Sequence, residues 1–298
     1  MLSIIITSYK EPKSTAKAVE CFLKQNIKEP YELIVTDPFP EVKEFITKKF
    51  KKYKQVKFFQ DPGKGKVYAL NLLFSKVKGD ILILTDGDVF VSKNSVKAIL
   101  KEFEDEKVGV VCGRPVSLND KNTMFGYWSH LLADSANKLR KYLSKKNKFL
   151  ECTGYLFAFR KGVIKDIPTD VAEDSIIPYL FWKKGYKIKY AEDAIVYVKN
   201  PDNFKDWMKQ RKRTADAHTK LDKYYPDFPK VKCFKNEVKY GTFLALSYPR
   251  TLKEIFWTKV LFLARLYMWC ALFYDLKFKR KGYKDGWERV KSTSPLDG

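Results

Sequence analysis

Histidine is scarce in this sequence, and cysteine follows no metal-binding pattern. The two histidines, His130 and His218, do not combine with other residues into a His-x-x-x-His, Ser-His-Asp or Cys-His set. The five cysteines are odd in number, widely scattered and without a Cys-x-x-Cys pair, which argues against a zinc site or a disulfide framework. Reduced thiols of a cytosolic protein are the default expectation. Any catalysis therefore has to rely on carboxylates and metal ions.

Long uncharged stretches are also missing. The longest run without Asp, Glu, Lys or Arg is Asn122–Ala133, which has only 12 residues, so we expect no plain transmembrane helix. The first residues lack a basic region and run directly into a strand-like pattern. We therefore expect no signal peptide.

Acidic residues are outnumbered by basic ones. The 298 residues include 58 Lys and Arg but only 35 Asp and Glu, which gives a net charge of +23. This excess predicts an anionic partner: nucleic acid, an anionic membrane surface or a phosphorylated substrate. Hydrophobic residues (45%) suffice for a real core, which excludes wholesale disorder, and the length fits one large or two ordinary domains.

The first half of the chain alternates short apolar runs with helical patterns. This alternation indicates βαβ units and an α/β fold with a largely parallel sheet, whose strand carboxyl ends meet at one edge. Ligands of such sheets bind at that edge. The expected strands are Leu2–Thr7, Tyr31–Thr36, Val56–Gln60 and Asp80–Thr85, and the expected helices are Ser14–Gln25, Glu41–Tyr53 and Val67–Val77.

The second half is less regular, and it contains no internal repeat. Helical and strand-like patterns still alternate there, but with longer connections. The expected strands are Val108–Cys112, Leu156–Arg160, Lys187–Tyr190 and Ala194–Val198, and the expected helices are Lys93–Glu104, Thr123–Tyr142, Ile176–Lys184 and Asn203–Leu221.

Two carboxylates follow the predicted strand that ends at Thr85. Asp86 and Asp88 are separated by Gly87, whose backbone freedom lets both side chains turn toward one hard divalent cation. Mg²⁺ or Mn²⁺ held in this way can bridge a diphosphate and neutralise a leaving phosphate. Asp-Gly is also a favoured turn pair, so the segment alone is compatible with a simple β-turn.

Three further segments carry candidate polar groups, each with a plainer alternative. Gly63-Lys64-Gly65-Lys66 precedes a helix and could approach phosphates, but it lacks the P-loop pattern and also fits a solvated basic turn. Glu173-Asp174 could supply a general base or cap the following helix. Gln210 and Arg213 share a helix face and could hold a sugar and a phosphate, or form a solvated basic surface.

The order of these segments resembles that of the family 2 glycosyltransferases, inverting enzymes with the GT-A fold. The opening Leu2-Ser-Ile-Ile-Ile-Thr-Ser-Tyr-Lys-Glu-Pro is similar to the family's first strand and its Thr/Ser-Tyr-Asn-Glu turn, with Lys10 in the usual Asn place. Gly79-Asp-Ile-Leu-Ile-Leu-Thr-Asp-Gly-Asp is similar to its Asp-x-Asp strand. The resemblance covers about residues 1–220.

Four later segments extend the resemblance. Asp61-Pro-Gly-Lys-Gly-Lys-Val-Tyr-Ala-Leu-Asn resembles a segment often written Gly-Lys-x-x-Ala-Leu-Asn, and Gly154-Tyr-Leu-Phe-Ala-Phe-Arg-Lys resembles the acceptor-side strand. Glu173-Asp174 stands where the family has its Glu-Asp base motif. Gln210-Arg-Lys-Arg resembles Gln-x-x-Arg-Trp, with Thr214 replacing Trp, which weakens any expectation of processive polymerisation.

The resemblance implies a role for each matching residue. Asp174 would be the catalytic base, Asp88 and Asp86 would hold Mn²⁺ or Mg²⁺, and Gly154 and Glu173 would lie on the acceptor side. The implied reaction moves one hexose, of mannose or glucose type, from a GDP- or UDP-sugar to a hydroxyl or phosphate acceptor. The residues implied on the donor side are Tyr9, Glu11, Asp37, Lys64, Lys66, Asp86, Gln210 and Arg213.

Residues 221–298 are expected to form a C-terminal helical, membrane-associating region after a catalytic domain of residues 1–220. Ile255–Leu276 has ten Ile, Leu, Val or Phe residues, worth roughly −3 to −6 kcal/mol of insertion free energy, against roughly 5–7 kcal/mol for Lys259 and Arg265. The free energy of spanning the membrane is therefore close to zero. The aromatic residues of this segment favour the membrane interface. Lys277–Lys291 adds a net charge of +5, which favours an anionic leaflet.

These features predict a peripheral, monotopic protein on the cytoplasmic face of the cell membrane, with a lipid-linked acceptor. A buried helical hairpin or an oligomer interface would explain the same C-terminal composition. For the whole chain, two other functions stay open. A basic module that binds nucleic acid or an anionic surface would explain the charge, although no nucleic-acid motif is recognisable. A nucleotidyltransferase of related fold would release pyrophosphate, but its usual glycine-rich loop is missing.

Overall fold

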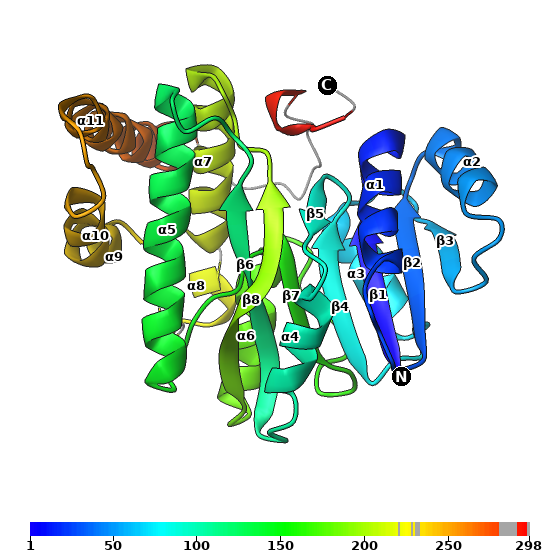
Figure 1. Ribbon diagram of the computed structural model, residues 1–298. Coiled ribbons are helices and arrows are strands. Elements are labelled where there is room, and N and C mark those ends of the chain that lie inside the picture. Colours follow the sequence, from blue (N-terminus) through cyan, green and yellow to red (C-terminus); the bar gives the residue numbers. More distant parts are fainter. Residues whose placement is uncertain (220, 228, 230–232, 280–290, 297–298) are drawn as a thin grey trace.

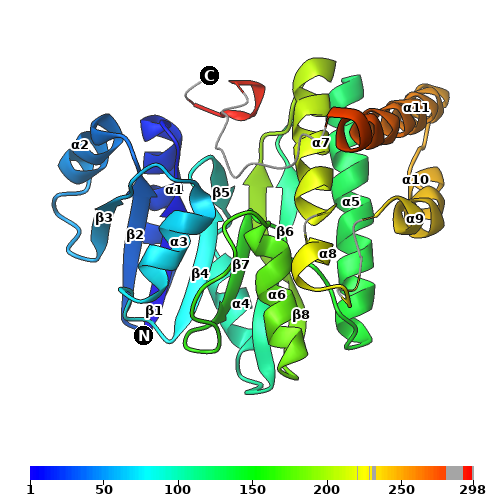
Figure 2. The same cartoon turned by 180° about the vertical axis from the view of Figure 1, so that it is seen from behind.

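The computed structural model describes residues 1–219, 221–227, 229, 233–279 and 291–296. The apolar runs pair into one sheet, and helices cover both of its faces (Figures 1 and 2). The strands are β1 (Leu2–Thr7), β2 (Tyr31–Asp37), β3 (Val56–Gln60), β4 (Ile81–Asp86), β5 (Val89–Val91), β6 (Val108–Ser117), β7 (Leu156–Arg160) and β8 (Lys187–Val198).

Helices connect the strands and make up the C-terminal part of the described chain. Two π-helical turns, Glu237–Gly241 and Asp275–Lys279, follow α9 and α11, and Lys291–Thr293 is a 3₁₀ turn. The helices are α1 (Pro12–Leu23), α2 (Pro40–Lys49), α3 (Lys66–Phe74), α4 (Ser95–Glu102), α5 (Met124–Lys145), α6 (Glu173–Lys183), α7 (Phe204–Thr219), α8 (Leu221–Tyr224), α9 (Phe234–Asn236), α10 (Thr242–Leu246) and α11 (Leu252–Tyr274).

The sheet has the strand order β3-β2-β1-β4-β7-β6-β8-β5. Strands β1 to β4 are parallel, as the βαβ pattern predicts. Strand β7 runs antiparallel to both of its neighbours, β4 and β6, and β5 runs antiparallel to β8. The largely parallel sheet that we expected is therefore mixed in its second half, because apolar periodicity reports a strand and not its direction.

Most expected elements are present with ends shifted by a few residues, and three differences are larger. Lys187–Tyr190 and Ala194–Val198 are parts of one strand, β8, which stays paired with β6 across a register shift near Cys112. Helix α6 begins at Glu173 and not at Ile176, so both carboxylates lie in its first turn. The three-residue strand β5 was not expected, because so short a run carries no periodic signal.

Alternation along the strands divides the core into two layers. Ile4 and Ile6 of β1 belong to a cluster with residues of α1, α2 and α4. Ile5, between them, belongs to a cluster with residues of α3 and α6 on the other face. Because both faces of the central strands are buried, these strands read as continuous apolar runs.

A third apolar cluster joins α11 to α5 and α7. Tyr127 and Thr258 share a hydrogen bond of 2.7 Å between their hydroxyls, and Trp128 Nε1 donates to the Trp257 carbonyl at 2.8 Å. Helix α11 is the one candidate in the described part of the chain that is long and apolar enough to cross a membrane, and a third of its apolar window is buried. Our criterion of an uncharged run misses it, because Lys259 and Arg265 interrupt the apolar sequence.

The C-terminal turn lies over the middle of the sheet, away from α11. Ser292 Oγ donates to Asp206 Oδ2 at 2.5 Å, and the Leu296 amide donates to Ser14 Oγ at 3.3 Å. The last described residues therefore lie between α7 and α1, above the carboxyl ends of the central strands (Figure 1). Much of the basic stretch Lys277–Lys291 falls outside the described residues.

Candidate active site

Strands β1 and β4 end side by side, and this brings the first polar residues together. Thr7 Oγ1 donates to Asp86 Oδ1 at 3.0 Å, and the Gly87 amide donates to the Thr7 carbonyl at 2.7 Å. A Cβ atom on Gly87 would lie 2.7 Å from Thr15 Oγ1 of α1, so a side chain does not fit here without movement. Asp86-Gly87-Asp88 thus forms the tight connection from β4 to β5, packed closely against α1.

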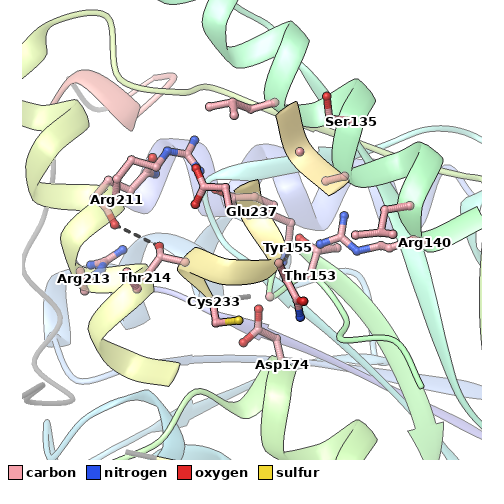
Figure 3. Close-up of a pocket in the computed structure, with 18 of the residues that line it drawn as sticks. Ser135, Arg140, Thr153, Tyr155, Asp174, Arg211, Arg213, Thr214, Cys233 and Glu237 are labelled. Carbon is pink, nitrogen blue, oxygen red and sulfur yellow. Dashed lines mark hydrogen bonds between the residues drawn. The ribbon is translucent and has the colours of Figure 1, made fainter. Parts of the chain in front are cut away.

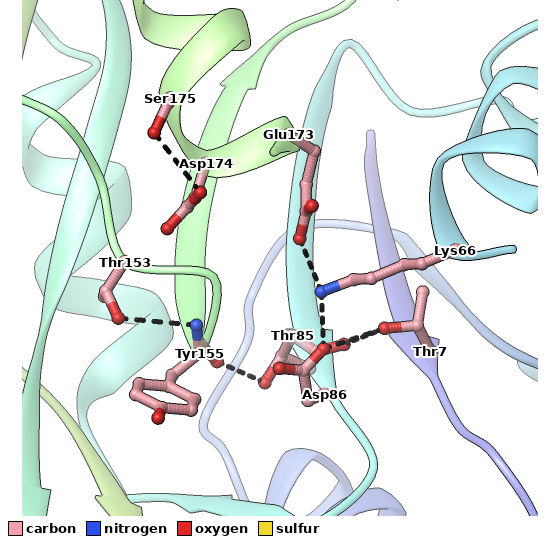
Figure 4. A network of polar contacts seen from close by, with 9 residues as sticks. All are labelled: Thr7, Lys66, Thr85, Asp86, Thr153, Tyr155, Glu173, Asp174 and Ser175. Carbon is pink, nitrogen blue, oxygen red and sulfur yellow. Dashed lines mark hydrogen bonds and ion pairs between the residues drawn. The ribbon is translucent and has the colours of Figure 1, made fainter. Parts of the chain in front are cut away.

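Lys66 is the electrostatic centre of the site. Its Nζ atom lies 2.6 Å from Asp86 Oδ1 and 2.5 Å from Glu173 Oε1, so one buried ammonium joins β4 to α6 (Figure 4). Burial alone would lower the pKa of Lys66, but the Asp86 and Glu173 carboxylates raise it above its usual range. Lys66 is therefore a fixed positive charge. Of the two lysines expected on the donor side, Lys66 lines the cavity, and Lys64 lies over the Tyr68 ring outside it.

Asp88 lies in an acidic environment. Burial, together with the carboxylates of Asp86 and Glu11, raises the pKa of Asp88 to about 8. A divalent cation would offset this repulsion, and carboxylate oxygens are the ligands that Mg²⁺ and Mn²⁺ prefer. Within the described ranges, no group of three or more His, Cys, Asp or Glu side chains is arranged to hold a metal ion. Asp88 and Asp86 are two mutually repelling carboxylates, and this donor set fits a divalent ion that takes its remaining ligands from a diphosphate and water.

A second polar group lies beside this edge, after β1 and β2. Asp37 accepts hydrogen bonds from the Lys10 amide at 2.9 Å and from the Phe39 amide at 2.8 Å. Burial raises the pKa of the Asp37 carboxyl, and these amide bonds oppose the rise. The Tyr9 ring packs edge-on against Phe39 at 5.1 Å, and Glu11 is buried immediately before α1. Lys10 adopts a left-handed backbone conformation, φ 58°, which re-aims the chain toward Asp37.

The first turn of α6 faces the loop before β7. A Cβ atom on Gly154 would lie 3.5 Å from Glu173 Oε1 and 3.9 Å from Asp174 Oδ2, so Gly154 lies directly beside both carboxylates. The Asp174 carbonyl accepts from the Cys152 amide at 3.0 Å. Burial raises the pKa of Glu173, and Lys66 opposes this rise. Glu173 is bound to Lys66 and does not act as the side-chain cap of α6, whose cap residue is Ala172.

One cavity of about 460 Å³ connects these groups to the C-terminal helices (Figure 3). Its walls come from α5, α7, the loop before β7, the first turn of α6 and the segment around α9 and α10. Of the residues expected from the sequence, seven line it: Lys66, Asp86, Gly154, Glu173, Asp174, Gln210 and Arg213. Tyr9, Glu11, Asp37, Lys64 and Asp88 are not among the lining residues, and the first three lie along the neighbouring edge of β1 and β2.

Most lining residues had no role expected from the sequence, and among them are four that carry a hydroxyl, a guanidinium or a carboxylate. Ser135 and Arg140 come from α5, Arg211 comes from α7, and Glu237 comes from the turn after α9. Glu237 forms a bidentate ion pair with Arg265 and accepts from Trp269 Nε1 at 2.9 Å, which ties the turn to α11. No motif marks Ser135, Arg140 or Glu237, because they reach the cavity from segments that are distant in sequence. Arg211 lies within the Gln210-Arg-Lys-Arg motif, at a position to which the motif assigns no role.

The sequence of residues 3–168 matches the family model described as Glycosyl transferase family 2. The match covers more than half of the chain. The chain belongs to glycosyl transferase family 2. The matched segment includes the Asp86-Gly87-Asp88 connection and Lys66, and it ends before Glu173.

Curated relatives of the family share part of this sequence. The chain is 28% identical over 177 residues to the probable glycosyltransferase YdaM of Bacillus subtilis, covering 57% of this chain and 42% of that protein. It is 31% identical over 127 residues to the O-antigen chain rhamnosyltransferase WbaN of Salmonella anatum, covering 39% of each. The chain thus spans about two fifths of the length of these relatives.

Solved structures share the fold. A mannosyltransferase of Pyrobaculum calidifontis in complex with GDP-Man and Mn²⁺ superimposes with a TM-score of 0.61 at 17% identity, covering 93% of this chain and 81% of that one. TarS of Staphylococcus aureus, residues 1–349, in complex with UDP-GlcNAc gives a TM-score of 0.50 at 14% identity, covering 82% and 70%. The GT-A fold expected from the motifs is thereby confirmed.

Proposed function

We propose that this family 2 protein transfers one hexose, of mannose or glucose type, from a GDP- or UDP-sugar to a hydroxyl or phosphate acceptor, with inversion. The observation that carries the proposal is the cavity itself, which places Asp86 and Lys66 at one end and Asp174 beside Gly154. The GDP-Man and UDP-GlcNAc complexes of similar folds support a nucleotide-sugar donor. Tyr9, Glu11 and Asp37 would contact its nucleoside along the β1 and β2 edge.

For a hydroxyl acceptor, Asp174 would act as the general base. It takes the hydroxyl proton while the acceptor oxygen forms a bond to the anomeric carbon, and the bond from that carbon to the diphosphate oxygen breaks on the opposite face. The electron pair of the broken bond leaves with the nucleoside diphosphate. Gln210 and Arg213 line the same cavity and would hold the donor and acceptor in this geometry. A phosphate acceptor is already an anion and needs no base.

The negative charge of the leaving group needs cationic partners. Asp88 and Asp86 would hold Mn²⁺ or Mg²⁺, which when bound stabilises the diphosphate by charge. Lys66 fixes the orientation of the Asp86 carboxylate through its 2.6 Å contact. Arg213, on α7, would add a second positive charge that takes no part in the contact between Lys66 and Asp86.

We also propose that the acceptor is lipid-linked and that the protein lies peripherally on the cytoplasmic face of the cell membrane. Helix α11 packs one face against α5 and α7 and leaves Phe256 (63%) and Leu263 (67%) exposed on the other. A helix docked on one side and apolar on the other fits the membrane interface better than a membrane crossing. The segment just before α11 forms a wall of the cavity, through Tyr240 and Leu244.

A ligand panel with three variants tests the enzymatic proposal. GDP, UDP, GDP-mannose and UDP-glucose are titrated with and without Mn²⁺, and labelled sugar is followed into a lipid extract. We expect metal-dependent binding of one nucleotide, lost in Asp88→Asn. Asp174→Asn should bind the donor normally but transfer to a hydroxyl acceptor at least about 100-fold more slowly. The exposed Asp193→Asn is the matched control. Unchanged transfer in Asp174→Asn to a hydroxyl acceptor would remove the base assignment.

A further inference from the structure

The charges of the cavity are unequally paired. Lys66 is bound to Asp86 and Glu173, and Arg265 is bound to Glu237. Among the residues that the structure describes, no carboxylate forms an ion pair with Arg140 or Arg211. Both arginines line the cavity, and so does Arg213, which likewise has no ion pair among the described residues, so the wall presents guanidinium groups that no described carboxylate binds directly.

Arg140 has hydrogen-bonding capacity left over. Its Nε atom donates to the Glu151 carbonyl at 3.2 Å, which fixes the side chain against the loop that leads to Thr153 and Gly154. Its Nη1 atom is buried without a partner among the described residues, and so is Ser135 Oγ, five residues earlier on α5. A buried donor without an acceptor costs free energy unless a ligand supplies one. In Figure 3, Arg140 lies beside Thr153.

Arg211 has the same property on another wall. Its Nε atom is buried and unpartnered in the described part of the chain, and Gln210 Oε1 beside it is also unpartnered. Burial lowers the pKa of Arg211, and the neighbouring Arg265 lowers it further, whereas Tyr155 and Glu237 oppose the fall. Arg211 lies on α7 and Arg140 lies on α5, so a ligand in the cavity meets a guanidinium from two sides.

The α5 wall also has an apolar part. Leu132, Ala136 and Leu139 line the cavity at helical spacing with Ser135 and Arg140. The start of α5 is docked to α11 through Trp128 and Trp257, whereas Arg140 lies near the other end of α5. Along this wall, the surface changes from apolar on the α11 side to cationic on the side of the Gly154 loop.

We propose that Arg140 and Arg211 bind a phosphate group of the acceptor, and that the Leu132–Leu139 wall takes the alkyl chain attached to it. The acceptor class is thus an amphiphile with an acidic head, an alkyl phosphate, held with its head toward Asp174 and its chain toward α11. This inference rests on the proposed transferase function, because it assigns the acceptor side of that site. Ser135 donates a neutral hydrogen bond to the same head group.

The test is a titration of the full chain with dodecyl phosphate, methyl phosphate and the neutral dodecyl maltoside, followed by calorimetry. Arg140→Gln and Arg211→Gln should each weaken dodecyl phosphate binding roughly tenfold to 100-fold. Arg140→Lys keeps the charge and should retain part of the affinity. Arg114→Gln removes an arginine outside the cavity and is the matched control. Binding of GDP or UDP with Mn²⁺ should stay within about threefold in all four variants.

Each arm of the test can fail separately. Unchanged dodecyl phosphate affinity in Arg140→Gln and Arg211→Gln would overturn the phosphate site. Equal binding of dodecyl maltoside would show that the head group is not recognised and would overturn it as well. Equal affinity for methyl phosphate would overturn the apolar wall and leave a site for a free phosphate. Nucleotide binding is measured on the same samples. Its absence in the unaltered chain would count against the transferase proposal and not against this site, whereas its loss only in Arg140→Gln or Arg211→Gln would place these arginines on the donor and overturn the acceptor assignment.

Discussion

Lys66 shows how much a single residue does in this site. Its ammonium is the shared partner of Asp86 and Glu173, at 2.6 and 2.5 Å. The contacts hold the start of α3, the end of β4 and the start of α6 in one arrangement. In sequence, Gly63-Lys64-Gly65-Lys66 resembles a phosphate-binding turn. In the structure, its Lys66 links α3, β4 and α6 through a buried ion-pair network.

Replacing Lys66 should destabilise the protein strongly. Lys66→Met keeps the side-chain volume but leaves two carboxylates without their cation, and breaking a buried ion pair in this way costs about 3–5 kcal/mol. Lys64→Met changes a neighbouring exposed lysine whose only described contact is with the Tyr68 ring, so we expect less than about 1 kcal/mol. Urea unfolding measures both. Equal stability of the two variants would mean that the ion pairs of Lys66 with Asp86 and Glu173 do not stabilise the fold.

Asp88 makes the stability of the metal-free protein dependent on pH. Its pKa is raised to about 8 by burial and by Asp86 and Glu11, with Lys66 opposing, whereas in the unfolded chain it titrates near 3.9. Between these values the folded state holds a proton that the unfolded state has lost. The free energy of unfolding should therefore fall as pH rises from about 4 to about 8.

The measurement is the melting temperature in EDTA at about pH 5 and about pH 9. We expect Asp88→Asn to reduce the drop in melting temperature between these pH values by at least about 5 °C, since each pKa unit is worth about 1.4 kcal/mol and about 1 kcal/mol corresponds to 2–4 °C. A drop of the same size in both proteins would mean that Asp88 is ionised in the folded state throughout this range.

At the scale of the element, α11 has two faces with different surroundings. Leu261 and Met268 are buried against α5 and α7, whereas Phe256 and Leu263 are more than 60% exposed. The capping box formed by Thr251 and Glu254 defines where the helix begins. The buried face fixes the helix to the catalytic part, and the exposed face is left for another contact.

Acidic residues on the exposed face should release the protein from membranes. Burial of two large apolar side chains is worth roughly 3–6 kcal/mol, so Phe256→Glu combined with Leu263→Glu should weaken binding to phosphatidylglycerol-containing vesicles at least about 100-fold. Phe45→Glu, on α2 at the other end of the molecule, is the matched control. Vesicle flotation and size-exclusion chromatography are read together. A double variant that still floats, or that changes only its oligomeric state, would contradict the membrane role.

At the scale of the whole molecule, sequence patterns predicted several strands and some of the residues that meet at the cavity. The bounds of β1, β3 and β7 agree with the structure, and the ordered motifs brought Lys66, Asp86 and Asp174 to one cavity. The direction of β7 was not predictable, since it depends on the path of the chain across the sheet. Arg140 was also missed, because its place in the cavity follows from the packing of α5 against distant segments and not from its neighbours in sequence.

Strand β7 also has a consequence for the synthesis of this protein. It is the only link between β4 and β6 in the strand order, yet it follows β4 by about 70 residues, as the bond from Thr85 to Tyr155 records. On a ribosome adding 5–20 residues per second, the edge of β4 waits roughly 4–14 s for its partner. During that time Ile81–Leu84 is an uncharged, unpaired strand edge, the kind of segment that chaperones cover and that nascent chains aggregate through.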